Sequence, residues 1–396
     1  MIIRWFISKK VREAVAMRQH VRKLLNAQRD ILSPQAIAGI QAAMAALRKT
    51  VAGGADKAAL KKEMENMEKA ADRWLKPYPH PAWRENVEVL LVALAVAMGI
   101  RTFFLQPFKI PTGSMQPTLW GVTSTNLIDH PEIKFPTGLA RIRDWFHGTS
   151  YVHLVAQADG PVEIIERPWP AVIFSIYQRV RVAGKWQFIW FPPDYGSPPA
   201  GTLEARAGLV DQSGRLKAGQ FYRKGQDIVR MRVNAGDHLF VDRMTYNFRR
   251  PRRGEIIVFE TKGIDESLRS HFAVPGNQFY IKRLVALGEE RVSIGADHHL
   301  SINNHRLDAS TPGFEFVYTF GPNAGDNEYF GHLPTGIFSD VNEEYQLRRN
   351  HLMVMGDNTR NSLDSRFFGD FAREYVIGKS WFVYWPISSR FGVGYR

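Results

Sequence analysis

The feature that most constrains this chain is one apolar stretch, because residues 89–100 are all apolar or glycine. These twelve residues are too few to cross a bilayer, but their apolar flanks extend the run to 86–107, which is long enough for one spanning helix. Glu88 and Arg101 lie near its ends, where long charged side chains reach the interface. We therefore predict one transmembrane helix over 86–107. A buried core helix is the alternative, since apolar runs of about 10–14 residues often have that role.

The positive charge of the chain is concentrated before this stretch. Residues 1–84 carry 17 Lys and Arg against 7 Asp and Glu, which is most of the net charge of +13. By the positive-inside rule, the segment before the helix lies in the cytoplasm and the rest lies across the membrane. Basic proteins can bind nucleic acid, but membrane topology explains the charge without it. We predict no nucleic-acid partner.

Residues 1–84 form the predicted cytoplasmic helical region. Ser33 and Pro34 are typical of a helix start, with a hydroxyl at the N-cap and a proline in the first turn. The alanine-rich helix that follows ends near the Gly-Gly pair at 53–54. A second helix is expected over about 56–76, because apolar residues recur there at three- and four-residue spacing. We expect an antiparallel helical pair or a short coiled coil. The apolar stripe consists of Leu60, Met64, Met67, Ala71 and Trp74.

The chain beyond the membrane helix has the pattern of a β domain. Short runs rich in β-branched and aromatic residues alternate with turns of Gly, Pro, Asn and Asp, which is typical of a mostly β fold. There is no cysteine in the sequence, which excludes disulfides, thiolate zinc sites and a cysteine nucleophile. The runs that we predict as strands are 238–243, 255–259, 279–287, 291–294, 299–302, 351–355 and 381–385.

Four short segments combine reactive or charged residues with apolar neighbours, namely 108–119, 253–259, 280–286 and 356–366. The first contains Ser114 within Thr-Gly-Ser-Met, the third begins Tyr-Ile-Lys-Arg, and the fourth reads Gly-Asp-Asn-x-x-Asn-Ser-x-Asp-Ser-Arg. Each segment is weak by itself. A serine in such a turn is usually there for its conformation, and a lysine in an apolar strand is usually an edge residue with its head in water.

In this order and behind a membrane helix, the four segments resemble bacterial type I signal peptidases. The Ser-Met-x-Pro-Thr-Leu, Tyr-Ile-Lys-Arg and Gly-Asp-Asn boxes match that family, and the resemblance covers residues 86–120 and 236–390. It implies a mostly β catalytic domain with the antiparallel signal-peptidase fold, formed by 108–120 and 236–396. It also implies a serine endopeptidase that removes signal peptides from exported preproteins and needs no cofactor.

The resemblance implies a Ser–Lys dyad, with Ser114 as the nucleophile and Lys282 as its general base. The chemistry of the residues agrees with these roles. A serine hydroxyl is a poor nucleophile until a base takes its proton. A lysine among apolar neighbours loses hydration of its charged form, so its pKa falls and the free amine becomes a usable base.

Further residues support the dyad in the family pattern. The Ser114 backbone N–H and the Thr112 hydroxyl bind the oxyanion, although most relatives carry serine where this chain has threonine. Ser362 contacts and orients the lysine nitrogen, and Asp364 and Arg366 form a salt bridge that steadies the surrounding loop. The substrate cleft is expected to be shallow and apolar and to admit small residues, as in Ala-x-Ala cleavage sites. The residues at its lining positions are Phe108, Ile110, Pro111, Met115, Leu119, Tyr280 and Ile281.

A long insertion separates two parts of the family pattern. In simple relatives the serine box runs almost directly into a Gly-Asp-x-Leu-x-Val segment, which begins here only at Gly236. Residues 121–235 are therefore predicted to be an inserted β-rich module. Residues 178–182 alternate as a half-buried strand does, and 188–191 form a continuous apolar run. An exposed aromatic face for the membrane interface or for a partner is one hypothesis, and an ordinary β core is the other.

No metal site is predicted from the histidines. His298 and His299 are adjacent, without the helical i, i+4 spacing and the glutamate of a zinc protease. The chain also lacks a glycine-rich phosphate loop, and Ser–Lys chemistry requires no cofactor.

These inferences place the protein in the cell inner (cytoplasmic) membrane, with a single span, a cytoplasmic N-terminus and the catalytic domain on the outer side. The expected partners are preprotein signal peptides and the lipid bilayer, with the secretion machinery as a further option. Two rival functions stay open. One is a soluble Ser–Lys self-cleaving repressor, which would need a DNA-binding helical module. The other is a catalytically inactive, membrane-tethered scaffold, against which the presence of both dyad residues counts.

Overall fold

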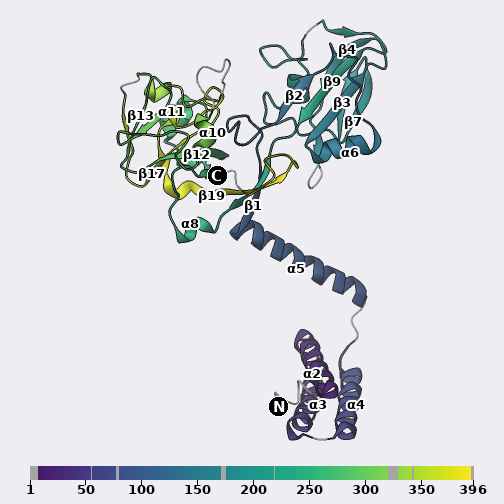
Figure 1. Ribbon diagram of the computed structural model, residues 1–396. Coiled ribbons are helices and arrows are strands. Elements are labelled where there is room, and N and C mark those ends of the chain that lie inside the picture. Colours follow the sequence, from purple (N-terminus) through teal and green to yellow (C-terminus); the bar gives the residue numbers. More distant parts are fainter. Residues whose placement is uncertain are drawn as a thin grey trace. The chain divides into compact units, whose positions relative to one another are not determined.

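The computed structural model describes residues 8–54, 56–76, 80–170, 175–217, 219–319, 329–340 and 343–393. Parts of the predicted segments that fall between or beyond these ranges lie outside the described residues. The chain divides into two compact units, Met1–Leu94 and Ala95–Arg396 (Figure 1). The first unit is helical and the second is mostly β, as the sequence predicts.

Among the described residues from 8 to 76, three helices form a bundle, α2 (Lys9–Gln28), α3 (Pro34–Gly53) and α4 (Lys57–Trp74). Ser33 caps α3 by accepting from the Ala36 N–H at 3.2 Å. The predicted helical pair is thus incomplete, because α2 joins α3 and α4 around a common core. The Gln28 side chain ties the end of α2 to the end of α4 through both backbone groups of Lys76. The buried core residues are Ala14, Val21, Leu25, Ile40, Leu47, Val51, Leu60 and Met67.

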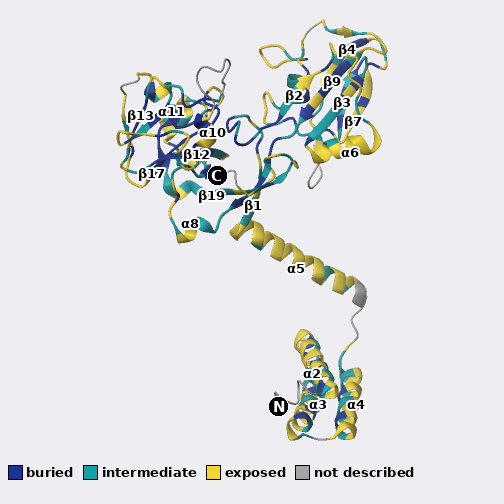
Figure 2. Cartoon of the chain, in the orientation of Figure 1, coloured by how far each residue is buried: buried dark blue, intermediate teal, exposed yellow. Residues whose placement is uncertain are grey.

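Helix α5 (Pro81–Phe103) contains the apolar stretch. Its segment Trp83–Phe103 is 21 residues long with a mean hydropathy of 1.7, so one helix here is long and apolar enough to cross a membrane. None of that window is buried, which does not fit a core helix (Figure 2). The predicted end at residue 107 is wrong, because α5 ends at Phe103 and strand β1 (Leu105–Lys109) follows. Pro107 has no N–H for a helical hydrogen bond, and it pairs instead with Phe240 in the sheet.

The centre of the second unit is an antiparallel sheet in the order β1-β10-β19-β11-β12-β17-β18, with β20 paired to β19. Its strand β12 lies between β11 and β17. The predicted strands 279–287 and 351–355 coincide with β12 and β17, whose buried residues are apolar except for Lys282 and Arg283 of β12. The remaining strand bounds are β10 (His238–Asp242), β11 (Ile256–Glu260), β12 (Phe279–Leu287), β17 (His351–Met355), β18 (Phe371–Ala372), β19 (Val376–Trp385) and β20 (Gly392–Val393).

A smaller antiparallel sheet, in the order β15-β14-β13-β16, packs on the same domain and shares a core with residues of β12 and β17. Its strands are β13 (Arg291–Ile294), β14 (Leu300–Ile302), β15 (His305–Arg306) and β16 (Tyr345–Gln346). Short helices connect the strands: α8 (Thr245–Phe248), η1 (Thr261–Gly263), α9 (Glu266–His271), α10 (Glu315–Tyr318), η2 (Gly336–Phe338), α11 (Ser365–Phe368) and η3 (Arg373–Tyr375).

The region between the serine segment and β10 forms a β-rich module with its own core. One sheet has the order β2-β9-β3, and a second has the order β5-β6-β4-β8 with β7 paired to β6 (Figure 1). The predicted strand at 178–182 is part of β6. The elements are β2 (Thr123–Asn126), α6 (Gly138–Phe146), β3 (Thr149–Val155), β4 (Gly160–Ile165), β5 (Trp169–Pro170), β6 (Ser175–Val182), β7 (Lys185–Trp190), α7 (Leu203–Arg206), β8 (Phe221–Tyr222) and β9 (Asp227–Asn234).

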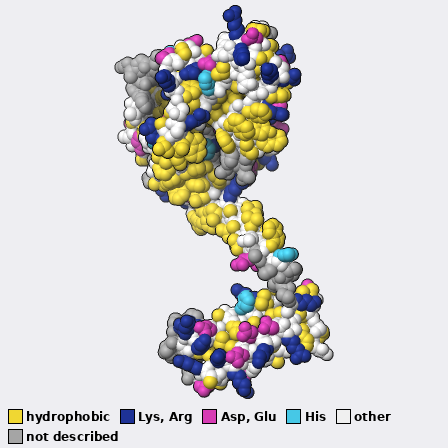
Figure 3. All heavy atoms as spheres, turned by 90° about the vertical axis from the view of Figure 1, so that its right-hand side faces the viewer, with side chains coloured by type: hydrophobic (Ala, Val, Ile, Leu, Met, Phe, Trp, Pro, Cys, Tyr) yellow, Lys and Arg dark blue, Asp and Glu magenta, His cyan; other side chains and the backbone are white. Residues whose placement is uncertain are grey.

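The aromatic side chains of strand β7 lie on the face opposite the module core. Gln187 and Ile189 are buried, whereas Trp186, Phe188 and Trp190 are exposed on the opposite face, as alternation along a strand requires. The apolar run at 188–191 is therefore not an ordinary buried strand. Phe188 stacks on Trp190 with ring centroids 5.9 Å apart. Figure 3 shows hydrophobic side chains gathered into broad patches on the β-rich unit.

Gly236 allows the strands around the serine segment to approach closely. A Cβ atom at this position would lie 1.9 Å from the Ile110 carbonyl oxygen. We expect Gly236→Ala to lower the free energy of unfolding of the β-rich unit by at least about 1–3 kcal/mol, the usual cost of overpacking. Thermal unfolding of the detergent-solubilised protein measures this. Gly53→Ala is the control, because a Cβ there meets nothing within 4 Å. Equal melting temperatures for the two variants would contradict the prediction.

Candidate active site

Ser114 lies in the turn that follows β1 and is 5 % exposed. The backbone of this turn is held by the Gly-Asp-Asn segment. The Asn358 N–H donates to the Ser114 carbonyl oxygen at 3.1 Å, and the Asn358 side-chain amide donates to the Gly113 carbonyl oxygen at 3.1 Å. The first and fourth segments singled out in the sequence are thereby joined.

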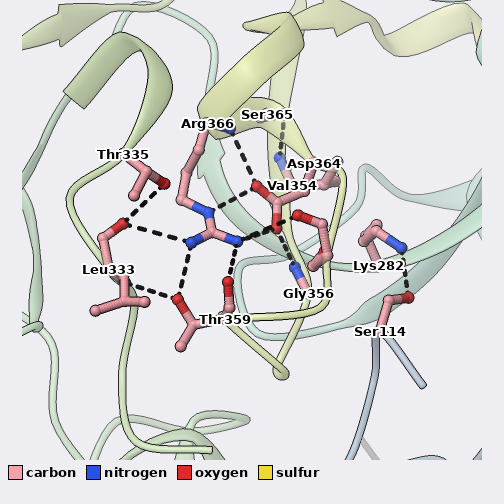
Figure 4. A network of polar contacts seen from close by, with 11 residues as sticks. Ser114, Lys282, Leu333, Thr335, Val354, Gly356, Thr359, Asp364, Ser365 and Arg366 are labelled. Atoms are coloured by element: carbon pink, nitrogen blue, oxygen red, sulfur yellow. Dashed lines mark hydrogen bonds and ion pairs between the residues drawn. The ribbon is translucent and has the colours of Figure 1, made fainter. Parts of the chain in front are cut away.

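Lys282 reaches Ser114 from the middle of the main sheet. It lies in β12 opposite Ile257 of β11 and, like Ser114, is 5 % exposed. Its Nζ atom is 2.7 Å from Ser114 Oγ (Figure 4). The amine also donates to the Ile281 carbonyl oxygen at 3.1 Å. Two residues that are 168 positions apart in the chain thus form a direct hydrogen bond.

Burial lowers the pKa of Lys282 to about 8, because the charged ammonium loses its hydration in this apolar strand. Asp364 and Asp357 oppose this effect by attracting the positive charge, whereas Arg366 adds to it. A pKa near 8 leaves about half of the amines uncharged at pH 8. The neutral amine has the lone pair that a general base needs to accept the Ser114 proton.

Asp364 and Arg366 form a buried ion pair beside the dyad, with Arg366 Nε 2.9 Å from Asp364 Oδ1 (Figure 4). The second carboxylate oxygen accepts the Gly356 N–H at 3.0 Å. Burial alone would raise the pKa of Asp364, but the Arg366 guanidinium holds it below its usual value. Arg366 also donates to the side-chain and backbone oxygens of Thr359. The pair therefore fixes the loop from Gly356 to Arg366.

A second buried ion pair joins Arg283 to Asp357, and the sequence argument did not identify it. Arg283 Nε is 2.7 Å from Asp357 Oδ1, Thr118 donates to the same carboxylate, and Arg283 donates to the Gly254 carbonyl oxygen at 2.8 Å. The signal was available, because Arg283 follows Lys282 in an apolar strand and a lone charge there needs a partner. This pair connects all four segments of the motif.

The resemblance implies supporting roles for Ser362 and Thr112, but neither side chain forms a hydrogen bond with Ser114 or Lys282 in this structure. The Lys282 amine bonds to Ser114 and Ile281 and not to Ser362, which is buried against Gly356. Thr112 is exposed two residues before Ser114. Contact of Ser362 with the lysine and the oxyanion role of Thr112 both stay predictions.

The predicted cleft residues divide into two groups. Ile110, Met115 and Leu119 are fully buried in the core under the serine turn, so Met115 serves there as core packing. Phe108, Pro111, Tyr280 and Ile281 are only partly buried. A lining role fits the second group better, since a substrate can contact only side chains that reach the surface.

The arrangement combines a serine hydroxyl, an amine of lowered pKa and a hydrogen-bonded backbone frame, which could support hydrolysis through a covalent acyl intermediate. Among the described residues, no group of three His, Asp or Glu side chains is arranged to hold a metal ion. His299 instead stacks on the Tyr318 ring, with centroids 4.4 Å apart.

Comparison with known proteins shows the family to which this chain belongs. Residues 83–126 and 221–385, together more than half of the chain, match the family described as signal peptidase, peptidase S26. A signal peptidase I of Leptolyngbya laminosa is 29 % identical over 157 residues, which cover 39 % of this chain and 64 % of that protein. A probable signal peptidase I-2 of Synechocystis is 29 % identical over 158 residues, covering 39 % and 58 %. The chain thus matches less than two thirds of the length of these curated relatives.

A crystal structure of a signal peptidase I from Enterococcus faecalis is also similar, at 25 % sequence identity. The match covers 33 % of this chain and 97 % of that one, with a TM-score of 0.24. The family match includes β2 and resumes at Phe221, before β9. The family match therefore leaves out residues 127–220, which lie within the predicted insertion 121–235.

Replacement of Lys282 should show how much its burial lowers the free energy of unfolding. The pKa of Lys282 falls from its ordinary 10.5 to about 8 on folding, so between these pH values the unfolded chain binds a proton that the folded chain lacks. Stability therefore rises with pH in that window, and below it the buried lysine costs roughly 3 kcal/mol. We expect Lys282→Met to be more stable than the parent at pH 7 and to lose that rise.

Urea unfolding at pH 7 and pH 10 measures both effects. Replacement of the exposed Lys185 by methionine is the matched control, and it should leave the stability difference between the two pH values unchanged. A Lys282→Met variant that is less stable than the parent at pH 7 would overturn the argument.

Proposed function

Since this chain belongs to the signal peptidase (peptidase S26) family, we propose that it is a membrane-bound serine endopeptidase that removes N-terminal signal peptides from exported preproteins. The observation that carries this proposal is the 2.7 Å contact between Lys282 Nζ and Ser114 Oγ. The family is membrane-bound, and α5 is one candidate membrane helix in this chain. The repressor and scaffold alternatives have no observation in their favour.

In the proposed reaction, the neutral Lys282 amine accepts the Ser114 hydroxyl proton while Oγ attacks the scissile carbonyl carbon. The tetrahedral intermediate collapses when the leaving amine of the mature protein takes the proton from the Lys282 ammonium. This leaves the signal peptide esterified to Ser114. Lys282 then takes a proton from a water molecule, whose oxygen attacks the ester. Release of the signal peptide returns the proton to Ser114 Oγ and regenerates the neutral amine.

The charge that develops on the carbonyl oxygen requires donors. The proposed donors are the Ser114 backbone N–H and the Thr112 hydroxyl. The rigid serine turn supports the first role, because Asn358 fixes the carbonyl groups of Gly113 and Ser114. Preorganised donors of this kind stabilise the transition state more than the ground state.

The proposed substrate preference follows from the partly buried apolar side chains around the dyad. Phe108 packs on the Phe279 ring with centroids 5.4 Å apart, and the Tyr280 ring centroid is 5.4 Å from Lys282 Nζ. Such a shallow apolar surface favours small residues near the cleavage site. Ala-x-Ala sites of exported preproteins have these small residues.

The proposed location is the inner (cytoplasmic) membrane, with a cytoplasmic N-terminal bundle and the catalytic domain on the outer side. The charge of residues 1–84 supports this orientation through the positive-inside rule. The partners are preprotein signal peptides, the lipid bilayer and, as a further option, the secretion machinery.

The dyad is tested by cleavage of a preprotein with the purified protein in detergent. We expect Ser114→Ala and Lys282→Ala to abolish cleavage, since one removes the nucleophile and the other its base. The parent kcat/KM should rise with pH toward a plateau, with an apparent pKa near 8. Lys185→Ala, an exposed lysine in the module, is the control with unchanged activity. Undiminished cleavage by either dyad variant would refute the assignment.

The role of Thr112 is tested by a matched pair of substitutions. Thr112→Val keeps the shape of the side chain but removes the hydroxyl, and we expect kcat to fall by about 10²–10³, as for loss of one oxyanion donor. Thr112→Ser keeps the hydroxyl and should retain most activity. Full activity in the valine variant would show that this hydroxyl is not a donor.

A further inference from the structure

A cavity of about 440 Å³ in the second unit is rich in arginine. It lies at α8 and the start of β19, away from Ser114 and Lys282. Four arginines and one carboxylate, Glu374, line it, so its lining is strongly positive. The arginines are Arg243, Arg249, Arg250 and Arg373, and the aromatic residues Tyr246 and Phe248 line it as well.

Two of the four guanidinium groups are already engaged. Arg249 is paired with Glu255, and Arg243 Nη1 donates to Gln106 at 2.7 Å. In the part of the chain that the structure describes, the guanidinium groups of Arg250 and Arg373 have no recorded hydrogen bond or ion pair. Glu374 is the one carboxylate of the lining and Arg249 is paired with Glu255. Arg243, Arg250 and Arg373 therefore still leave the cavity with a net positive charge, which attracts an anion.

The cavity is joined to the point where the chain leaves its apolar helix. The Arg243 N–H donates to the carbonyl oxygen of Phe104 at 3.0 Å, one residue after α5 ends. In the sheet, Asp242 pairs with Leu105. Arg243, which lines the cavity, is therefore held next to the first residues after α5.

The length of the helix gives the depth of this point in a membrane. The 21 residues of Trp83–Phe103 rise about 31 Å at about 1.5 Å per residue, which matches the hydrocarbon thickness of about 30 Å. If α5 spans the membrane as proposed above, Phe104 lies at the boundary between acyl chains and headgroups. The cavity beside Arg243 then lies in the headgroup layer.

We propose that this cavity binds the headgroup phosphate of an anionic phospholipid. Arginine binds phosphate through paired N–H donors and stays charged at all physiological pH values. Phe248 is 81 % exposed at the cavity, as suits an aromatic side chain that enters the membrane interface. The position in the headgroup layer favours a lipid over free phosphate. This inference rests on the membrane anchoring in the proposed function.

Binding of this lipid gives the cavity a role in orientation. Arg243 follows β10, which pairs with β1, and β1 leads directly to the Ser114 turn. A phosphate held by Arg250 and Arg373 would therefore fix the height of the serine turn above the bilayer. The cleavage site of a substrate that is itself anchored in the membrane must meet Ser114 at that height.

The test uses the full-length protein in a nonionic detergent, with lipid binding measured by calorimetric titration. The probes are a short-chain phosphatidylglycerol, the matching zwitterionic phosphatidylcholine, inorganic phosphate and an acidic peptide. We expect the phosphatidylglycerol to bind tightest. In the double variant Arg250→Gln/Arg373→Gln its affinity should fall about fivefold for each arginine removed. Arg215→Gln/Arg223→Gln removes the same charge from exposed positions of the module and is the control.

Each outcome decides the proposal. Loss of phosphatidylglycerol binding in the cavity variant alone supports it. Equal affinity in both double variants overturns it, and so does preference for inorganic phosphate, for phosphatidylcholine or for the acidic peptide. Preprotein cleavage in detergent is measured in parallel and should be unchanged in the cavity variant. If the proposed peptidase function is wrong, the parent protein will not cleave the preprotein. That result does not depend on the outcome of the lipid titration.

Discussion

The hydrogen bond between Lys282 and Ser114 depends on a lysine that is buried in the middle of a sheet without a carboxylate of its own. A direct salt bridge would raise the pKa of the amine and keep it protonated. Burial in β12 has the opposite effect and lowers the pKa to about 8. The rest of the domain supplies the conditions for this burial, because the strands on both sides of β12 are apolar and exclude water from the amine.

The two buried ion pairs explain how acidic residues can lie near this lysine without neutralising its function. Asp364 and Asp357 each attract the Lys282 charge, yet each is bonded to an arginine, Arg366 or Arg283. The positive charge of the arginines offsets much of that attraction, so desolvation decides the pKa. The pairs also connect the serine turn, β12 and the Gly-Asp-Asn loop. The charges of the two ion pairs thus stabilise the fold around the site, whereas the Lys282 amine can lose its proton.

The sequence predicted the parts of this protein that are governed by local patterns. Strand β12 and the Tyr-Ile-Lys-Arg motif around Lys282 were found because an apolar run and a lysine coincide there. The Ser114–Lys282 pair, 168 positions apart, was predicted from the resemblance to a family. No local pattern joins Arg283 to Asp357, which are 74 positions apart, because their contact depends on the sheet order. The end of α5 was misplaced because Leu105 and Pro107 are as apolar as helix residues. Only their pairing with β10 makes them a strand.

The insertion shows how the site tolerates a large addition to the chain. The strands on either side of it, β2 and β9, pair with each other from Thr123 opposite Asn234. Asp237 closes the junction, since it accepts the Trp120 N–H at 2.8 Å and binds the Arg390 guanidinium. The two ends of the added segment therefore leave the catalytic sheet side by side, and loop closure costs little more as such a segment grows. The turn that carries Ser114 is held by Asn358, which lies outside the insertion, whereas Lys109 at the end of β1 also pairs with Asp194 of the module at 2.7 Å.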